Sequence, residues 1–176
     1  RSRFDKIHEF DAESRHLVLL CRNEEGYRNL SYMVSCAFTE GFYIKPRIDM
    51  DLLREHCSGL IACSACLGGE IPRRLQNSDY AGAKKHALEM LFGEDGYYLE
   101  LQDHNIPAQR QVNAGIIRLH EETGIPIIAT NDAHYLTRED AETQDILMCI
   151  QMGKTVDDPG RMKFETEEFY VKSEEE

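Results

Sequence analysis

The chain has 176 residues, a formal net charge of −12 at pH 7 and 41% hydrophobic residues. This length is sufficient for one domain with its own core, and the hydrophobic content argues against an intrinsically disordered chain. The acidic balance argues against binding of nucleic acid over the whole surface, although bound cations or the small basic clusters Lys45–Arg47 and Arg73–Arg74 could still approach phosphates.

The sequence carries no sign of a membrane segment or of a secretion signal. Its apolar runs are far shorter than the roughly 20 residues that a transmembrane helix requires, and the N-terminus lacks the apolar core of a signal peptide. The six cysteines are scattered through apolar segments, which favours reduced thiols. We therefore expect a soluble, cytoplasmic protein with no membrane partner. Because the first residue is not Met and the last residues are charged, we also expect a piece of a longer protein.

Four short runs of apolar, β-branched or aromatic residues have the length and composition of buried strands. They span residues 17–21, 60–63, 97–101 and 125–130. Segments with helical periodicity accompany them. These run from Asn23 to Gly41, from about Asp79 to Phe92, from about Ala108 to Thr123 and from about Arg138 to Met152.

The predicted helices have recognisable ends. Gly93, Gly124 and Gly153 supply C-terminal stop signals, and Thr137 with Asp140 forms an N-terminal capping pattern. Strands that alternate with helices predict parallel βαβ units with right-handed crossovers, hence an α/β fold. No Gly-rich phosphate loop is evident, so part of a βα barrel fits better than a Rossmann or P-loop domain.

The most informative feature lies where the last predicted strand stops, at Asp132 and His134. Residues i and i+2 of a strand point to the same side, so these two side chains could converge just beyond the strand's carboxyl end. Parallel βα architectures keep their chemistry at that end, and a carboxylate beside an imidazole suits zinc or manganese. The alternative is that Asp132 caps a loop and His134 is a partly exposed loop residue.

Other polar residues lie near strand ends. Cys66 follows the second predicted strand, and it could join the site, be a small buried hydrophobe or form a redox or zinc-knuckle pair with Cys63. His16 precedes the first strand, so it can join the site only if that strand is reversed or the strand order is irregular. Otherwise it caps a turn. Glu100 and His104 close the third strand, where they could support the site, face a substrate or serve the loop alone.

Five segments, in order, resemble the polymerase and histidinol phosphatase (PHP) domain, in the form found at the N-terminus of the alpha subunit of bacterial replicative DNA polymerase III. They are Arg15–Leu20, Gly41–Asp49, Ala65–Ile71, Tyr98–His104 and Ala129–Leu136. The resemblance implies part of a distorted seven-stranded, TIM-like βα barrel that lacks its first strands. Residues 1–160 would be the C-terminal two-thirds of that domain, and residues 161–176 an acidic boundary segment leading to the polymerase core.

The resemblance also implies a set of site residues. The metal ligands would be His16, Cys66, Asp132 and His134, of which Asp132 and His134 would also be the catalytic residues, and the intact domain would hold up to three ions of zinc or manganese. The complete family site further draws on a His-x-His motif, a Thr-Asp-His-Gly motif and a Gly-x-Glu motif that the resemblance places before Arg1. The first two do not occur in this chain. We therefore expect the chain by itself to be inactive.

The function that the resemblance implies is that of a replicative DNA polymerase, a nucleotidyltransferase, in which this domain carries metal-dependent phosphoesterase or 3′–5′ proofreading exonuclease chemistry. The partners would be the rest of the polymerase chain, the 3′ end of DNA and other replisome subunits. An alternative is a non-catalytic structural and docking module of the polymerase. A third, weaker alternative is a free-standing phosphatase of the same superfamily.

Overall fold

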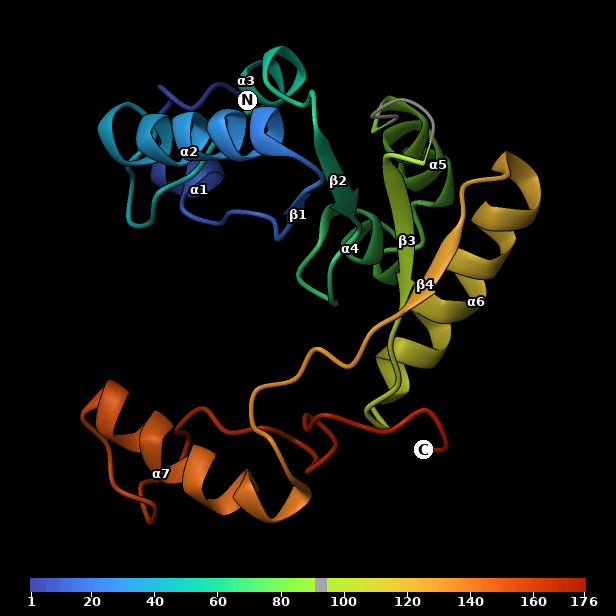
Figure 1. Ribbon diagram of the computed structural model, residues 1–176. Coiled ribbons are helices and arrows are strands. Elements are labelled where there is room, and N and C mark those ends of the chain that lie inside the picture. The colour runs from blue at the N-terminus through green and yellow to red at the C-terminus, as the bar shows by residue number, and fades with distance from the viewer. Residues whose placement is uncertain (91–94) are drawn as a thin grey trace.

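The fold is built on a mixed sheet with the strand order β1–β2–β3–β4 (Figure 1). The strands are β1 (Val18–Cys21), β2 (Leu60–Cys63), β3 (Tyr97–Leu101) and β4 (Ile127–Ala129). The computed structural model describes residues 1–90 and 95–176. Strands β2, β3 and β4 are parallel, whereas β1 is antiparallel to β2. The predicted α/β fold is therefore confirmed, and its strands are those expected from the sequence.

Helices make up the rest of the regular structure. They are α1 (His8–Asp11), α2 (Glu24–Thr39), α3 (Met50–Glu55), α4 (Glu70–Gln76), α5 (Tyr80–Glu89), α6 (Pro107–Thr123), the short 3₁₀ helix η1 (Arg138–Asp140) and α7 (Ala141–Met152). The four predicted helices are present. Helices α1, α3 and α4 were not predicted, because four to seven residues are too few to show helical periodicity. The predicted end of α5 at Phe92 and Gly93 lies outside the described residues.

The predicted end signals at Asn23, Thr137, Gly124 and Gly153 are also confirmed. The side chain of Asn23 accepts a hydrogen bond from a backbone N–H in the first turn of α2. Thr137 and Asp140 form a reciprocal capping box before α7. Gly124 and Gly153 close α6 and α7 with φ of 73° and 63°, in the left-handed region that glycine enters without a steric cost.

The direction of β1 corrects the prediction that all strands are parallel. Val18 pairs with Cys63 and Cys21 pairs with Leu60, so β1 runs against β2. Between the two strands the chain contains α3 as well as α2, so the connection is not the single-helix crossover on which the parallel prediction rested. As a result, the residues that precede β1 lie at the carboxyl end of β2.

The main core joins the sheet to the helices α4, α5 and α6, which pack on one another, and extends to α2 and α3. Its fully buried side chains include Met33, Ile71, Leu99, Ile116 and Leu119. Helix α7 lies apart from the sheet and is joined to it by the chain that leaves β4 (Figure 1). Among the described helices, none combines the length and hydrophobicity needed to cross a bilayer.

Gly26 provides a test of the packing between α2 and the entry to β2. A Cβ at this position would lie 1.9 Å from the carbonyl oxygen of Gly59, so the backbone of one of the two segments would have to move. We expect Gly26→Ala to lower the free energy of unfolding by about 3 kcal/mol, as overpacking does. Urea denaturation followed by circular dichroism measures this. The exposed position Ser31 on the same helix is the control, because Ser31→Ala should change stability by less than about 0.5 kcal/mol. Equal effects of the two substitutions would contradict the model of a close backbone contact.

Candidate metal centre

The loops that follow the parallel strands are tightly shaped. Ala65 after β2, Asn105 after β3 and Asp132 after β4 have φ of 63°, 60° and 43°. Positive φ is uncommon for residues other than glycine, although Asn and Asp adopt it more readily than Ala does. Two of these residues lie in segments that carry candidate ligands, Ala65 beside Cys66 and Asp132 itself.

His16 and Cys66 lie next to each other. The backbone N–H of His16 donates to the carbonyl oxygen of Gly68 at 3.1 Å, and His16 forms a parallel bridge with Gly69. Its Nδ1 lies 3.5 Å from Sγ of Cys66. A Cβ on Gly68 would stand 3.0 Å from that Nδ1, so the glycine allows the imidazole to approach the loop. Thus the reversal of β1 brings His16 to the end of the sheet where Cys66 lies.

The spacing of this pair fits a shared zinc ion. With Zn–S near 2.3 Å and Zn–N near 2.05 Å, a tetrahedral site separates the two donor atoms by about 3.6 Å. The observed separation between Sγ and Nδ1 is 3.5 Å. A thiol–imidazole hydrogen bond would have a similar length. The pair therefore has the donor chemistry and the spacing of two ligands, and by itself does not complete a site.

Asp132 acts on Cys66 electrostatically. Burial raises the pKa of the Cys66 thiol above its ordinary value, and the Asp132 carboxylate raises this pKa further, against the opposing effect of a backbone N–H from Gly68. Both effects favour the neutral thiol. A cation between the two groups would reverse this preference, because ligation needs the thiolate.

His134 is held with one ring nitrogen available. Its Nδ1 lies 2.8 Å from the carbonyl oxygen of Asp132, to which a protonated Nδ1 donates, and in the neutral imidazole of this tautomer Nε2 carries the lone pair. The ring meets Phe164 and Phe169 edge-on, at centroid distances of 4.8 Å and 5.4 Å. His134 is exposed and oriented, which suits a ligand or a proton acceptor.

The structure does not gather all four candidate ligands at one point. Within residues 1–90 and 95–176, no three or more His, Cys, Asp and Glu side chains form a group that could hold one ion. His16 and Cys66 are together, Asp132 is within electrostatic reach of Cys66, and His134 is outside that group. Strand β4 ends at Ala129 and the chain turns at Asp132, so strand alternation does not govern the directions of Asp132 and His134.

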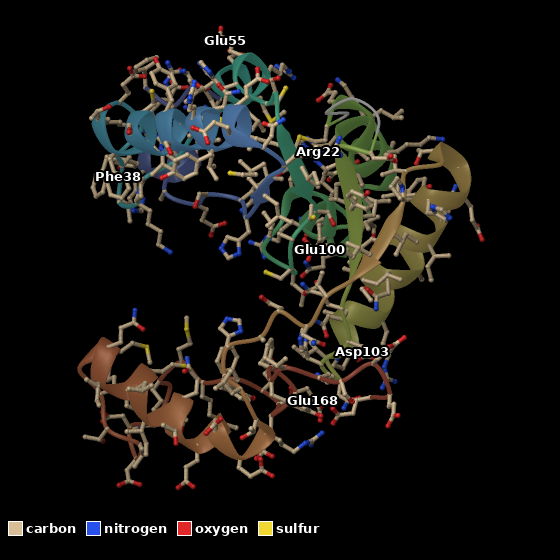
Figure 2. The ribbon with its side chains drawn as sticks, in the orientation of Figure 1. Arg22, Phe38, Glu55, Glu100, Asp103 and Glu168 are labelled. Atoms are coloured by element: carbon tan, nitrogen blue, oxygen red, sulfur yellow. The ribbon has the colours of Figure 1, made fainter. Side chains whose placement is uncertain are left out.

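Glu100 ties two of the loops together. Its buried carboxylate accepts the backbone N–H of Ala65 at 2.7 Å through Oε1 and the hydroxyl of Thr130 at 2.6 Å through Oε2. Gln102 also donates to Oε2, at 3.4 Å. Figure 2 labels Glu100, which lies on β3. One carboxylate thus connects the segment before Cys66 to the segment before Asp132.

His104 also holds the segment that precedes Asp132. It is fully buried, Gln109 Nε2 donates to its Nδ1 at 2.6 Å, and its Nε2–H therefore donates to the carbonyl oxygen of Asn131, also at 2.6 Å. The ring stacks on Phe169 at 4.1 Å. Glu100 and His104 are buried, so their contacts are with the loops that carry the candidate ligands.

Sequence reasoning missed Gln109 and Phe169. Gln109 is a buried polar residue of α6, and its Oε1 also accepts the backbone N–H of His104 at 2.8 Å. A glutamine on the apolar stripe of an amphipathic helix was the available signal. Phe169 gave no such signal, because it lies in a charged segment with no regular pattern.

A cavity lies beside this region and touches it at His16. It has a volume of about 480 Å³, reaches His16, and is not lined by Cys66, Asp132 or His134. Arginines on its wall form ion pairs with buried carboxylates, such as Arg3 with Asp49 at 3.2 Å. The positive charges of these arginines are therefore already paired with carboxylates of the fold.

The comparisons with known proteins agree on one family. Residues 3–104 match the family described as the PHP domain. The chain is 45% identical over 177 residues to DNA polymerase III subunit alpha of Treponema pallidum, covering 99% of the chain and 15% of that protein. The corresponding protein of Borreliella burgdorferi is 48% identical over 93% of the chain and 14% of its own length. The corresponding protein of Thermus aquaticus is 44% identical, over 99% of the chain and 15% of its own length. The chain thus spans about 15% of the length of these relatives.

The electrostatic contact between Asp132 and Cys66 can be tested by alkylation. Because the Asp132 carboxylate raises the pKa of the Cys66 thiol, Asp132→Asn should lower that pKa. Iodoacetamide labelling as a function of pH, read at Cys66 by peptide mass spectrometry, gives the midpoint in metal-free protein. Asp51→Asn removes the same charge at an exposed position on α3 and should leave the midpoint unchanged. An unchanged midpoint in Asp132→Asn would contradict the contact.

Proposed function

Because this chain belongs to the PHP domain family, we propose that it is part of the alpha subunit of a bacterial replicative DNA polymerase and contributes to a metal-dependent phosphoesterase site. In this proposal residues 1–160 are part of a distorted seven-stranded barrel whose first strands come from elsewhere in the parent protein. Residues 161–176 lead toward the polymerase core. The parent would act in the cytoplasm with other replisome subunits. The identity to three named alpha subunits supports the assignment.

One observation carries the proposed chemistry, namely the distance of 3.5 Å between Nδ1 of His16 and Sγ of Cys66. An imidazole and a thiol at ligand spacing, with a carboxylate close enough to perturb the thiol, form the donor set of a zinc or manganese site. His16, Cys66 and Asp132 would hold the ion, and His134 would supply its free Nε2 to the same cluster. The remaining ligands would come from other parts of the intact domain.

Bound divalent ions would supply a water of lowered pKa and would neutralise charge that develops on a phosphodiester. The residues of the chain prepare the site for such ions. Cys66 keeps its proton in the metal-free state, because burial and Asp132 raise the pKa of its thiol, and releases it on ligation. His134 keeps Nε2 available through the bond from Nδ1 to the carbonyl of Asp132.

The net charge of the chain makes cations the natural intermediary with DNA. A formal charge of −12 repels a phosphate backbone, and a cluster of divalent ions would offset this repulsion locally at a 3′ end. Glu100 and His104 hold the loops before Cys66 and Asp132, which limits how far these two loops would have to rearrange when an ion or a substrate arrives. Together these features support 3′–5′ exonuclease chemistry in the parent protein.

A second candidate function is a non-catalytic structural and docking module of the polymerase. The observation that favours it is that the described residues gather no group of three metal-binding side chains. Its acidic surface would suit protein partners at least as well as DNA. Metal content of the parent protein separates the two functions.

Substitutions at the proposed catalytic residues test the nuclease. In the full-length parent, Asp132→Asn and His134→Ala should each abolish metal-dependent 3′ exonuclease activity, because each removes a donor from the cluster. Polymerisation should remain largely intact. Release of the 3′ nucleotide from end-labelled DNA and primer extension measure the two activities. His8→Ala, at an exposed histidine of α1, should retain both. Undiminished nuclease activity in both site variants would refute the assignment.

Cobalt substitution tests whether the thiol is a ligand. The full-length parent loaded with Co²⁺ should show a thiolate-to-metal charge-transfer band in the near ultraviolet, and Cys66→Ser should lose it. Cys21→Ser, at an exposed cysteine of β1, is the matched control and should keep the band. Metal content by plasma emission, measured on the same samples, should be at least one ion per parent chain. The absence of both metal and band in the wild-type parent would favour the docking module.

A further inference from the structure

The acidic C-terminal part of the chain returns to the loop that carries Asp132 and His134. We call residues 164–172 the return segment. The carbonyl oxygen of Phe169 accepts the backbone N–H of His134 at 2.7 Å, and Tyr135 forms a parallel bridge with Tyr170. Figure 2 shows the return segment, labelled at Glu168, beside the end of the β3 loop, labelled at Asp103. A segment that the sequence suggests is only a boundary is therefore part of the surroundings of the site.

Glu168 anchors the return segment. Its carboxylate lies 2.6 Å from Arg138 and 3.6 Å from Lys172, and its side chain is 13% exposed. These two cations offset a charge that would otherwise disfavour burial. Phe169, the next residue, is 7% exposed. The anchor therefore holds a large apolar side chain under the loop.

The ring of Phe169 contacts both histidines of the region. It stacks on His104 with a centroid distance of 4.1 Å and an interplanar angle of 10°. It also meets the ring of His134 at 5.4 Å and 89°. The ring of Phe164 contacts both rings as well, because its centroid lies 4.5 Å from that of Phe169 and 4.8 Å from that of His134. Two aromatic rings thus restrict an exposed imidazole that would otherwise be free to change rotamer.

We propose that Phe169 is a positioning residue of the metal site, which fixes the imidazole of His134 for ligation. This inference rests on the proposed function. The hydrogen bond from Nδ1 of His134 to the carbonyl oxygen of Asp132 and the edge contact with Phe169 together set the direction of Nε2. His104 stacks on the ring of Phe169 and is hydrogen-bonded to the carbonyl oxygen of Asn131, so it holds Phe169 against the loop that carries Asp132 and His134. Residues that orient a ligand in this way change metal affinity by about 10-fold to 100-fold when they are replaced.

The test measures zinc affinity of the full-length parent by competition with a chromogenic chelator. Phe169→Leu keeps most of the buried apolar volume and removes the flat ring, so the melting temperature should stay near that of the wild type. Zinc affinity should nevertheless fall by about 10-fold or more. Phe38→Ala removes an exposed phenylalanine on α2 and should change neither quantity.

A double-mutant cycle separates positioning from general stability. If Phe169 acts through His134, the variant with both Phe169→Leu and His134→Ala should bind zinc about as weakly as His134→Ala alone. Losses of zinc affinity that add in the double variant, or an unchanged zinc affinity in Phe169→Leu, would overturn the inference. If the wild-type parent binds zinc in that case, the proposed function still stands. A wild-type parent that binds no zinc would overturn the proposed function and this inference with it.

Discussion

A buried carboxylate between two loops is the interaction on which the candidate site depends. Glu100 lies at the end of β3, where an unpaired charge would be costly, and three hydrogen bonds satisfy it. Its partners lie in the segment before Cys66 and in the segment before Asp132. Because the carboxylate can meet its donors only when both loops are in place, the burial of one charge fixes the relative positions of two candidate ligands.

The second constraint is the direction of the edge strand. A parallel β1 would put His16 at the far end of the sheet from Cys66, whereas the observed antiparallel pairing puts their donor atoms 3.5 Å apart. Gly68 contributes at the same place, because any larger residue would meet the imidazole. Strand direction and one small residue therefore produce the pair that carries the proposed metal chemistry.

The sequence predicted the elements better than their arrangement. Periodicity, Asn23, Gly124 and the capping box at Thr137 located the long helices, because these signals are local. Strand direction is a property of the connection, and α3 is too short to be recognised from its pattern. Among the site residues, Asp132 and His134 were visible as polar residues after an apolar run. Their surroundings were not predictable in the same way, because the contact between His104 and Phe169 joins residues far apart in the sequence.

Docking of the return segment and ion binding at the proposed site are thermodynamically linked. In the proposed site, an ion that binds more tightly when Phe169 is docked must stabilise the docked state of Phe169 by the same free energy, since coupling between two binding equilibria is reciprocal. Binding of an ion would then favour the docked position of the return segment, and docking of the return segment would favour binding of the ion.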